Sequence, residues 1–159
     1  MLTIVACGAI AIAGCGGDDD STSASTESTA AKAPESTDTK PTVTVPKGAP
    51  PKQLEKNDLT EGDGAEAKSG DEVTVQYVGV NYKNGKEFDA SWDRGEPFTF
   101  TLGSSMVIPG WEQGVEGMKE GGRRELVIPP ELAYGPEGSP PAIGPDETLI
   151  FVIDLLEVG

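Results

Sequence analysis

All nine aromatic residues of this 159-residue chain lie between Tyr77 and Phe151. Aromatic side chains contribute the largest apolar areas to a protein core. A segment that lacks them and is rich in Ser, Thr, Pro and acidic residues cannot bury enough apolar surface to offset the entropy of an ordered chain. The distribution therefore predicts one folded domain in residues 51–159, preceded by a long tract without a core of its own.

The N-terminus carries a second signal. Residues 2–14 are apolar or small and uncharged, and this run is too short for a membrane-spanning helix, which needs about 20 apolar residues. The Ile-Ala-Gly that precedes Cys15 resembles the bacterial lipobox, in which the cysteine receives a diacylglyceryl group. We therefore expect a signal peptide in residues 1–14, lipid attachment at Cys15 and a disordered tether in residues 15–50. The alternatives are an ordinary apolar helix and a disulfide between Cys7 and Cys15.

The predicted lipid anchor also indicates where the protein is located. A lipidated Cys15 places the protein on the outer face of a bacterial cytoplasmic membrane or in a periplasm, anchored to the membrane by its lipid.

Charge and composition exclude several function classes. The formal net charge is −15, and no basic stripe interrupts the acidic excess, which disfavours a nucleic-acid partner. The chain contains no histidine, which excludes Ser/His/Asp and Cys/His nucleophiles and His-based zinc sites. We expect neither a metal nor a cofactor.

Hydrophobic periodicity predicts the elements of the folded half. Apolar and polar residues alternate in several short runs, as in strands with one buried face. The predicted strands are residues 72–78, 86–89, 97–103, 123–128 and 148–156. The only predicted helix covers residues 109–118, where Trp111, Val115 and Met118 share one face. One short helix with several antiparallel strands indicates an α+β domain.

Six ordered sequence blocks then carry a family resemblance. They are VQYVG (75–79), GKEFDAS (85–91), PF (97–98), VIPGWEQGV (107–115), AYG (133–135) and TLIF (148–151). In order and spacing they resemble the FKBP family of peptidyl-prolyl cis-trans isomerases. The resemblance implies a sheet of five or six antiparallel strands wrapped around one short helix, with a shallow apolar pocket between them. It also implies a monomer that binds proline-containing polypeptides and macrolide inhibitors.

The resemblance assigns roles to individual residues. Trp111 would form the pocket floor, and the residues expected as walls are Tyr77, Phe98, Val107, Ile108 and Phe151. Phe88 and Ile143 would lie near the rim, and Asp89 would be the pocket carboxylate, paired with Arg94 and bonded to the Tyr77 hydroxyl. Tyr134 and the Ile108 N–H would donate to substrate carbonyls. Met106 departs from the polar residue that many relatives have at the lip.

These residue types suit the chemistry that the resemblance implies. Rotation about an Xaa-Pro bond must break amide resonance, at a barrier of roughly 18–20 kcal/mol, but it needs no covalent intermediate. An aromatic pocket without a nucleophile can favour the twisted, less polar amide. We expect an isomerase that assists the folding of exported chains. The alternative is a non-catalytic module that holds proline-containing segments as a chaperone, and a purely structural lipoprotein is a third reading.

Overall fold

The structure, a computed structural model, describes residues 37–159. The predicted signal peptide, Cys15 and most of the predicted tether lie outside these residues. The helical elements are α1 (Ser91–Arg94), α2 (Pro109–Val115) and a short 3-10 helix η1 (Pro130–Leu132). The strands are β1 (Glu55–Thr60), β2 (Glu72–Asn81), β3 (Glu87–Ala90), β4 (Phe98–Thr101), β5 (Arg123–Ile128) and β6 (Leu149–Val158).

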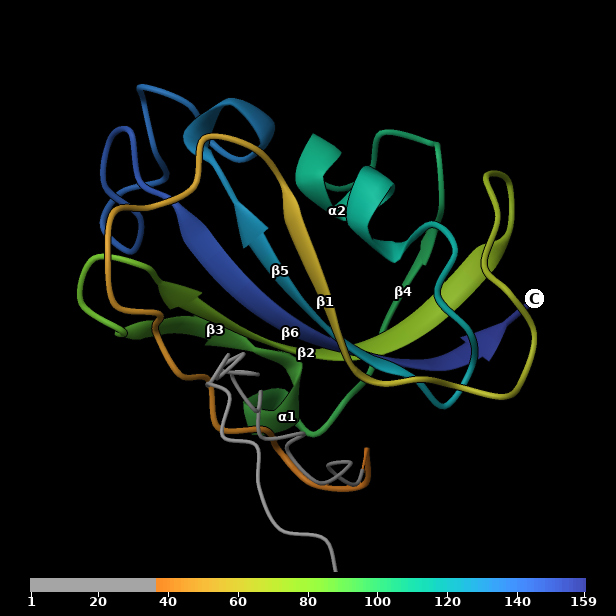
Figure 1. The fold of residues 1–159 in the computed structure, drawn as a ribbon. Coiled ribbons are helices and arrows are strands. Elements are labelled where there is room, and N and C mark those ends of the chain that lie inside the picture. Colours follow the sequence, from red (N-terminus) through yellow and green to blue (C-terminus); the bar gives the residue numbers. More distant parts are fainter. Residues whose placement is uncertain (1–36) are drawn as a thin grey trace, which may run out of the picture. The chain divides into compact units, whose positions relative to one another are not determined.

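The six strands form one antiparallel sheet in the order β1-β5-β6-β2-β3 (Figure 1). Strand β4 also pairs with β2, so that the first half of β2 contacts β4 and its second half contacts β3. The two long strands β2 and β6 pair along most of their length at the centre of the sheet. This sheet with few helices confirms the predicted α+β class.

The face of the sheet under α2 holds the main hydrophobic core. Val73, Val75 and Tyr77 alternate along β2 toward this face, as the period of a strand requires. On α2, Trp111 and Val115 are buried against it. Helix α2 therefore closes one side of the sheet, as the family resemblance implied.

The sequence expectations for the elements differed from the structure at three places. Helix α2 ends at Val115 rather than at residue 118, although Met118 is still buried in the core. The one-turn helix α1 was not predicted, because four residues are too few to show a helical period. Strand β1 was not identified either, since it lies at the edge of the sheet and most of its side chains are exposed, which leaves no apolar alternation.

The opposite face of the sheet is covered by the segment before β1. Val43 and Val45 pack there against a second cluster of buried residues, and Pro41 is buried. The cluster consists of Val78, Val80, Tyr82, Ala90, Val127 and Ile150. In Figure 1 this segment and α1 lie on the other side of the sheet from α2. The expected tether reached residue 50, whereas residues 37–50 belong to the ordered chain because the sheet has apolar side chains on both faces.

A buried ion pair joins the two neighbouring strands β5 and β6. The Arg123 side chain is 1% exposed and that of Asp154 is 0% exposed. Arg123 donates from Nε to Asp154 Oδ1 at 2.5 Å and from Nη2 to Oδ2 at 2.9 Å, which is a bidentate pair. Moving one strand away from the other would leave uncompensated buried charges. The pair therefore fixes β5 and β6 to each other in this region of the sheet.

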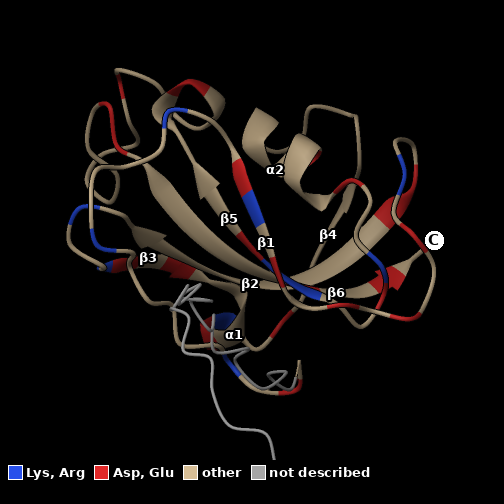
Figure 2. Ribbon diagram, in the orientation of Figure 1, with Lys and Arg blue, Asp and Glu red and all other residues tan. Residues whose placement is uncertain are grey.

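Charged residues lie mainly in loops and near strand ends of the domain, with Asp and Glu more numerous than Lys and Arg (Figure 2). Within residues 37–159, no helix combines the length and the apolar character that crossing a membrane requires.

Candidate active site

A cavity of about 380 Å³ opens between α2 and the sheet. Its walls come from β2, β3, β4, β6, α2 and two loops, so that segments far apart in the sequence meet around it. The lining residues are Tyr77, Phe88, Asp89, Phe98, Met106, Val107, Ile108, Trp111, Tyr134 and Phe151. Nine of these were predicted for the pocket, and Met106 was predicted at its lip.

Helix α2, which brings Trp111 to the cavity, packs closely against β5. A Cβ at Gly110 would lie 2.4 Å from Ile128, and one at Gly114 would lie 2.3 Å from Leu126. Both distances are far below van der Waals contact, so that a side chain at either position would displace Ile128, Leu126 or the helix itself. Pro109 at the first turn suits the start of the helix. The indole is thereby held at 4% exposure.

The aromatic walls meet this indole edge to face. The Trp111 ring centroid lies 5.0 Å from that of Tyr77 at an interplanar angle of 83°, and 5.2 Å from that of Phe151 at 89°. The Phe88 ring packs on Phe151 at 5.5 Å and 86°. A Cβ at Gly79 would lie 2.7 Å from Phe88 and 2.8 Å from Phe151, so that glycine is needed behind these two rings. T-shaped contacts of this kind favour one fixed arrangement of the walls.

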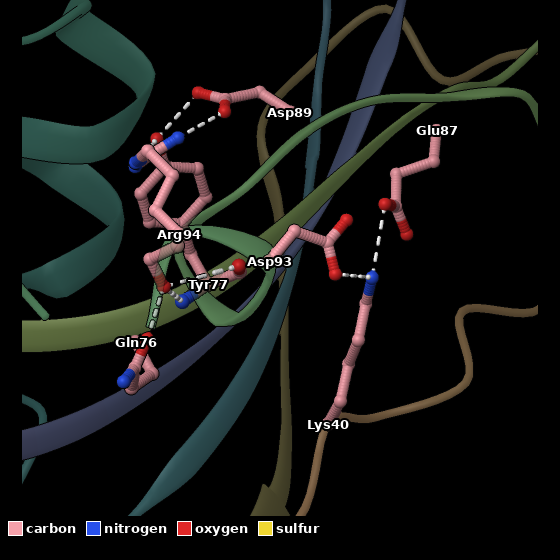
Figure 3. A network of polar contacts seen from close by, with 8 residues as sticks. Lys40, Gln76, Tyr77, Glu87, Asp89, Asp93 and Arg94 are labelled. Atoms are coloured by element: carbon pink, nitrogen blue, oxygen red, sulfur yellow. Dashed lines mark hydrogen bonds and ion pairs between the residues drawn. The ribbon is translucent and has the colours of Figure 1, made fainter. Parts of the chain in front are cut away.

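Three polar residues at the edge of the cavity bond to one another (Figure 3). The Tyr77 hydroxyl donates to Asp89 Oδ2 at 2.5 Å and accepts from Arg94 Nη2 at 2.9 Å. Arg94 Nη1 also donates to Asp89 Oδ1. Burial of Tyr77, together with its bond to Asp89, raises the pKa of its hydroxyl above the usual value. The group therefore presents a fixed carboxylate and a protonated phenol beside an apolar cavity.

Tyr134 and Ile108 bring possible donors to the cavity. Tyr134 follows η1 and is 41% exposed, and burial of its hydroxyl raises the pKa, with the Asp89 charge adding to the effect. The Ile108 carbonyl accepts from the N–H of Trp111 at 2.9 Å, at the start of α2. Its backbone is thereby fixed where the residue lines the cavity.

Glu112 is a residue that the sequence analysis missed. Its carboxylate accepts from the N–H of Ser105 at 2.9 Å and from the N–H of Gly103. These bonds tie the loop that carries Met106 and Val107 to helix α2. A glutamate in the first turn of a helix is a recognisable signal, but the loop that it holds cannot be read from the sequence.

Two predicted site residues lie outside the cavity lining. Arg94 contacts the pocket only through Asp89 and Tyr77. Ile143 was expected near the rim, but it is 4% exposed and belongs to the main core. Its amide pairs with the Ser139 carbonyl, which holds this loop against the core. Met106, in contrast, lines the cavity and is 64% exposed.

Known proteins share this chain's sequence and fold. The family of FKBP-type peptidyl-prolyl cis-trans isomerases matches residues 64–156. An FK506-binding protein of Streptomyces anulatus is 57% identical over 120 residues, which cover 75% of this chain and 97% of that protein. A probable FK506-binding protein of Corynebacterium glutamicum is 51% identical over 117 residues, which cover 74% and 97%.

Two crystal structures are similar as well. That of AtFKBP13 has a TM-score of 0.63 and 40% identity, and the match covers 69% of this chain and 96% of that one. That of FkpA from Escherichia coli has a TM-score of 0.61 and 48% identity, over 66% of this chain and 47% of that one. With the family match over more than half of its length, the chain belongs to the FKBP-type peptidyl-prolyl cis-trans isomerases.

Proposed function

We propose that this isomerase binds proline-containing polypeptides with the prolyl ring in the aromatic cavity, and turns the Xaa-Pro bond there without a covalent intermediate. The ring would lie over the Trp111 indole, between Tyr77, Phe98 and Phe151. The observation that carries this proposal is the aromatic cavity of about 380 Å³ with the Asp89 carboxylate at its edge.

The physical reason is the difference in polarity between the planar and the twisted amide. Twisting removes resonance and reduces the dipole, so that a water-poor apolar site destabilises the planar form relative to the transition state. The burial of Trp111 and Phe151, which are 4% and 3% exposed, supports such an environment. Catalysis then depends on stronger binding of the twisted amide than of either planar isomer.

The polar groups would act on the two carbonyls that flank the rotating bond. We assign the Tyr134 hydroxyl and the Ile108 N–H as donors to the substrate. The twisted amide loses electron donation from nitrogen to its carbonyl carbon, and a fixed carboxylate complements the partial positive charge that results. Asp89, held by Arg94 and Tyr77, would supply it.

The test is the exchange rate of an Xaa-Pro peptide, measured by NMR or by a protease-coupled assay. The chain should include residues 37–50, because these cover the second hydrophobic cluster. We expect acceleration by the wild type. We also expect slower turnover by Asp89→Ala, which should remain folded under the assay conditions because the Asp89 side chain is 43% exposed. An unchanged rate in Asp89→Ala would remove the proposed role of Asp89, and no acceleration by the wild type would remove the proposal itself.

We propose that macrolides of the FK506 class compete for the same cavity. Relatives that carry the name FK506-binding protein, at 57% and 51% identity, support this. Isothermal titration with and without an excess of Xaa-Pro peptide measures the competition. Macrolide binding by a chain that leaves the peptide exchange rate unchanged would favour the alternative function, a non-catalytic module that holds proline-containing segments.

The lipid anchor, the location and the clients remain proposals from the sequence. We infer that Cys15 is lipidated, that the enzyme is a monomer on the outer face of a bacterial cytoplasmic membrane or in a periplasm, and that it acts on exported chains. The apolar run before Cys15 supports this. The mass of the mature protein from its native membrane tests it: a diacylglyceryl group at an N-terminal Cys15 is expected, and an unmodified N-terminus elsewhere would contradict it.

A further inference from the structure

Residues 39–45, here called the strap, are fixed to the sheet at two places. Arg123 Nη2 donates to the Thr39 carbonyl at 2.8 Å, and Arg123 is itself held by the buried Asp154 carboxylate. Farther along, Val43 and Val45 pack against the second hydrophobic cluster. Backbone bonding and apolar packing thus hold the strap on both sides of residue 40.

Between these anchors, Lys40 reaches the segment that carries part of the active site. Its Nζ lies 3.0 Å from Glu87 Oε1 and 2.6 Å from Asp93 Oδ1 (Figure 3). Glu87 begins β3 and Asp93 lies in α1. Phe88 and Asp89, which line the cavity, are located between these two contacts. One side chain of the strap therefore spans the β3–α1 segment from end to end.

The β3–α1 segment is short and lies at the edge of the sheet. Strand β3 has four residues, pairs with β2 alone, and its register with β2 shifts within the pairing. Helix α1 is a single turn. Inside the segment, Ser91 is fixed, since its Oγ accepts from the N–H of Tyr77 at 2.8 Å and donates to Gln76. Lys40 of the strap adds a link between Glu87 and Asp93, near the two ends of the segment.

The charge of Lys40 also affects how the charged residues of the β3–α1 segment pair with one another. Residues 87–94 contain three carboxylates and one cation, Arg94. Arg94 pairs with Asp89, while the neighbouring Asp93 carboxylate lies 2.6 Å from Lys40 Nζ. Lys40 supplies the opposite charge for Asp93 and leaves Arg94 to Asp89.

We propose that Lys40 is a positioning residue of the isomerase site: it holds both ends of the β3–α1 segment and keeps Arg94 paired with Asp89. The strap is then part of the enzyme rather than part of the tether. This inference rests on the proposed role of Asp89 in turnover.

The test compares Lys40→Met, which keeps most of the side-chain length and removes the charge, with Lys40→Arg, which keeps the charge. Lys47→Met is the matched control, since it removes the same charge from an exposed position outside the cavity lining. We expect Lys40→Met to lower kcat/KM for an Xaa-Pro peptide about three- to tenfold, within the range that loss of two exposed ion pairs can produce. Lys40→Arg should restore most of the rate, and Lys47→Met should match the wild type.

A second measurement separates positioning from a general loss of stability. In an Asp89→Ala background, Lys40→Met should cause a smaller fold loss than in the wild type, because most of its effect passes through Asp89. About 1 M NaCl, where the Debye length is about 3 Å, should reduce the difference between the wild type and Lys40→Met. Equal rates for the wild type and Lys40→Met, or the same fold loss in the Asp89→Ala background, would overturn the inference. Because the wild-type rate is measured in the same series, failure of the proposed function would be recognised separately.

Discussion

The Tyr77 hydroxyl gives the sharpest test of the polar group in the pocket. Tyr77→Phe keeps the ring and its contact with Trp111 at 5.0 Å, but removes a bond to Asp89 at 2.5 Å and one from Arg94 at 2.9 Å. Hydrogen bonds to charged groups contribute about 1.5–3 kcal/mol each when buried. Here the Asp89 and Arg94 side chains are 43% and 48% exposed. Water can therefore hydrogen-bond to both groups in the variant, which reduces the loss of stability.

We therefore expect the free energy of unfolding to fall by about 1–2 kcal/mol in total. Urea denaturation followed by tryptophan fluorescence measures this change, and the m-value should stay constant because the same surface is exposed on unfolding. Turnover of an Xaa-Pro peptide should fall about tenfold, since Asp89 loses one of its two donors.

Tyr82→Phe is the matched control for this prediction. The Tyr82 hydroxyl lies 3.4 Å from the Ala49 carbonyl, a weak bond on the opposite face of the sheet. Its loss should cost less than about 0.5 kcal/mol and leave turnover unchanged. If Tyr77→Phe behaves like Tyr82→Phe in both stability and turnover, the reasoning about the pocket's polar group is wrong.

Two further predictions concern the loop and the pH dependence. Glu112→Gln weakens the bonds to the N–H groups of Gly103 and Ser105, so that KM measured with an Xaa-Pro peptide should rise several-fold; an unchanged KM would show that the loop needs no such tie. Burial raises the pKa of Tyr77 and Tyr134, so that the stabilisation from the neutral hydroxyls is complete below about pH 10 and is lost as the pH rises through the higher folded-state pKa. With no histidine in the chain, turnover should be constant between about pH 6 and 9 and fall above about pH 10, and a step inside the lower range would contradict this.

The central strands could be predicted because apolar residues alternate with polar residues along them, which marks the buried face of a strand. Val73, Val75 and Tyr77 alternate with polar residues, and the structure places them in the main core. The aromatic cavity could be predicted only through the family resemblance, since no periodicity shows that Phe88 and Phe151 meet. Ile143 shows the limit of such a transfer, because the fold of its own loop decides whether it lies at the rim or in the core.

The strap was missed although the sequence contains a hint of it. Strand β6 is apolar on both faces, and Ile150 would be exposed if only α2 covered the sheet. Val43 and Val45 alternate with threonines, but the run is short and lies between prolines in a polar tract. Long-range charge pairs such as Lys40 with Asp93 cannot be deduced, because a sequence does not reveal which charged residues become neighbours.

The central claim is that the Xaa-Pro bond of a peptide isomerises while its prolyl ring lies over Trp111. The chain has two tryptophans, which allow a direct measurement. Trp111 lines the cavity, whereas Trp92 packs against the second hydrophobic cluster on the other face. In an NMR titration of the 15N-labelled chain, the indole N–H signal of Trp111 should shift and broaden as peptide is added, while peptide cis-trans exchange accelerates in the same sample. The Trp92 signal should remain in place. Accelerated exchange with an unchanged Trp111 signal would contradict the account.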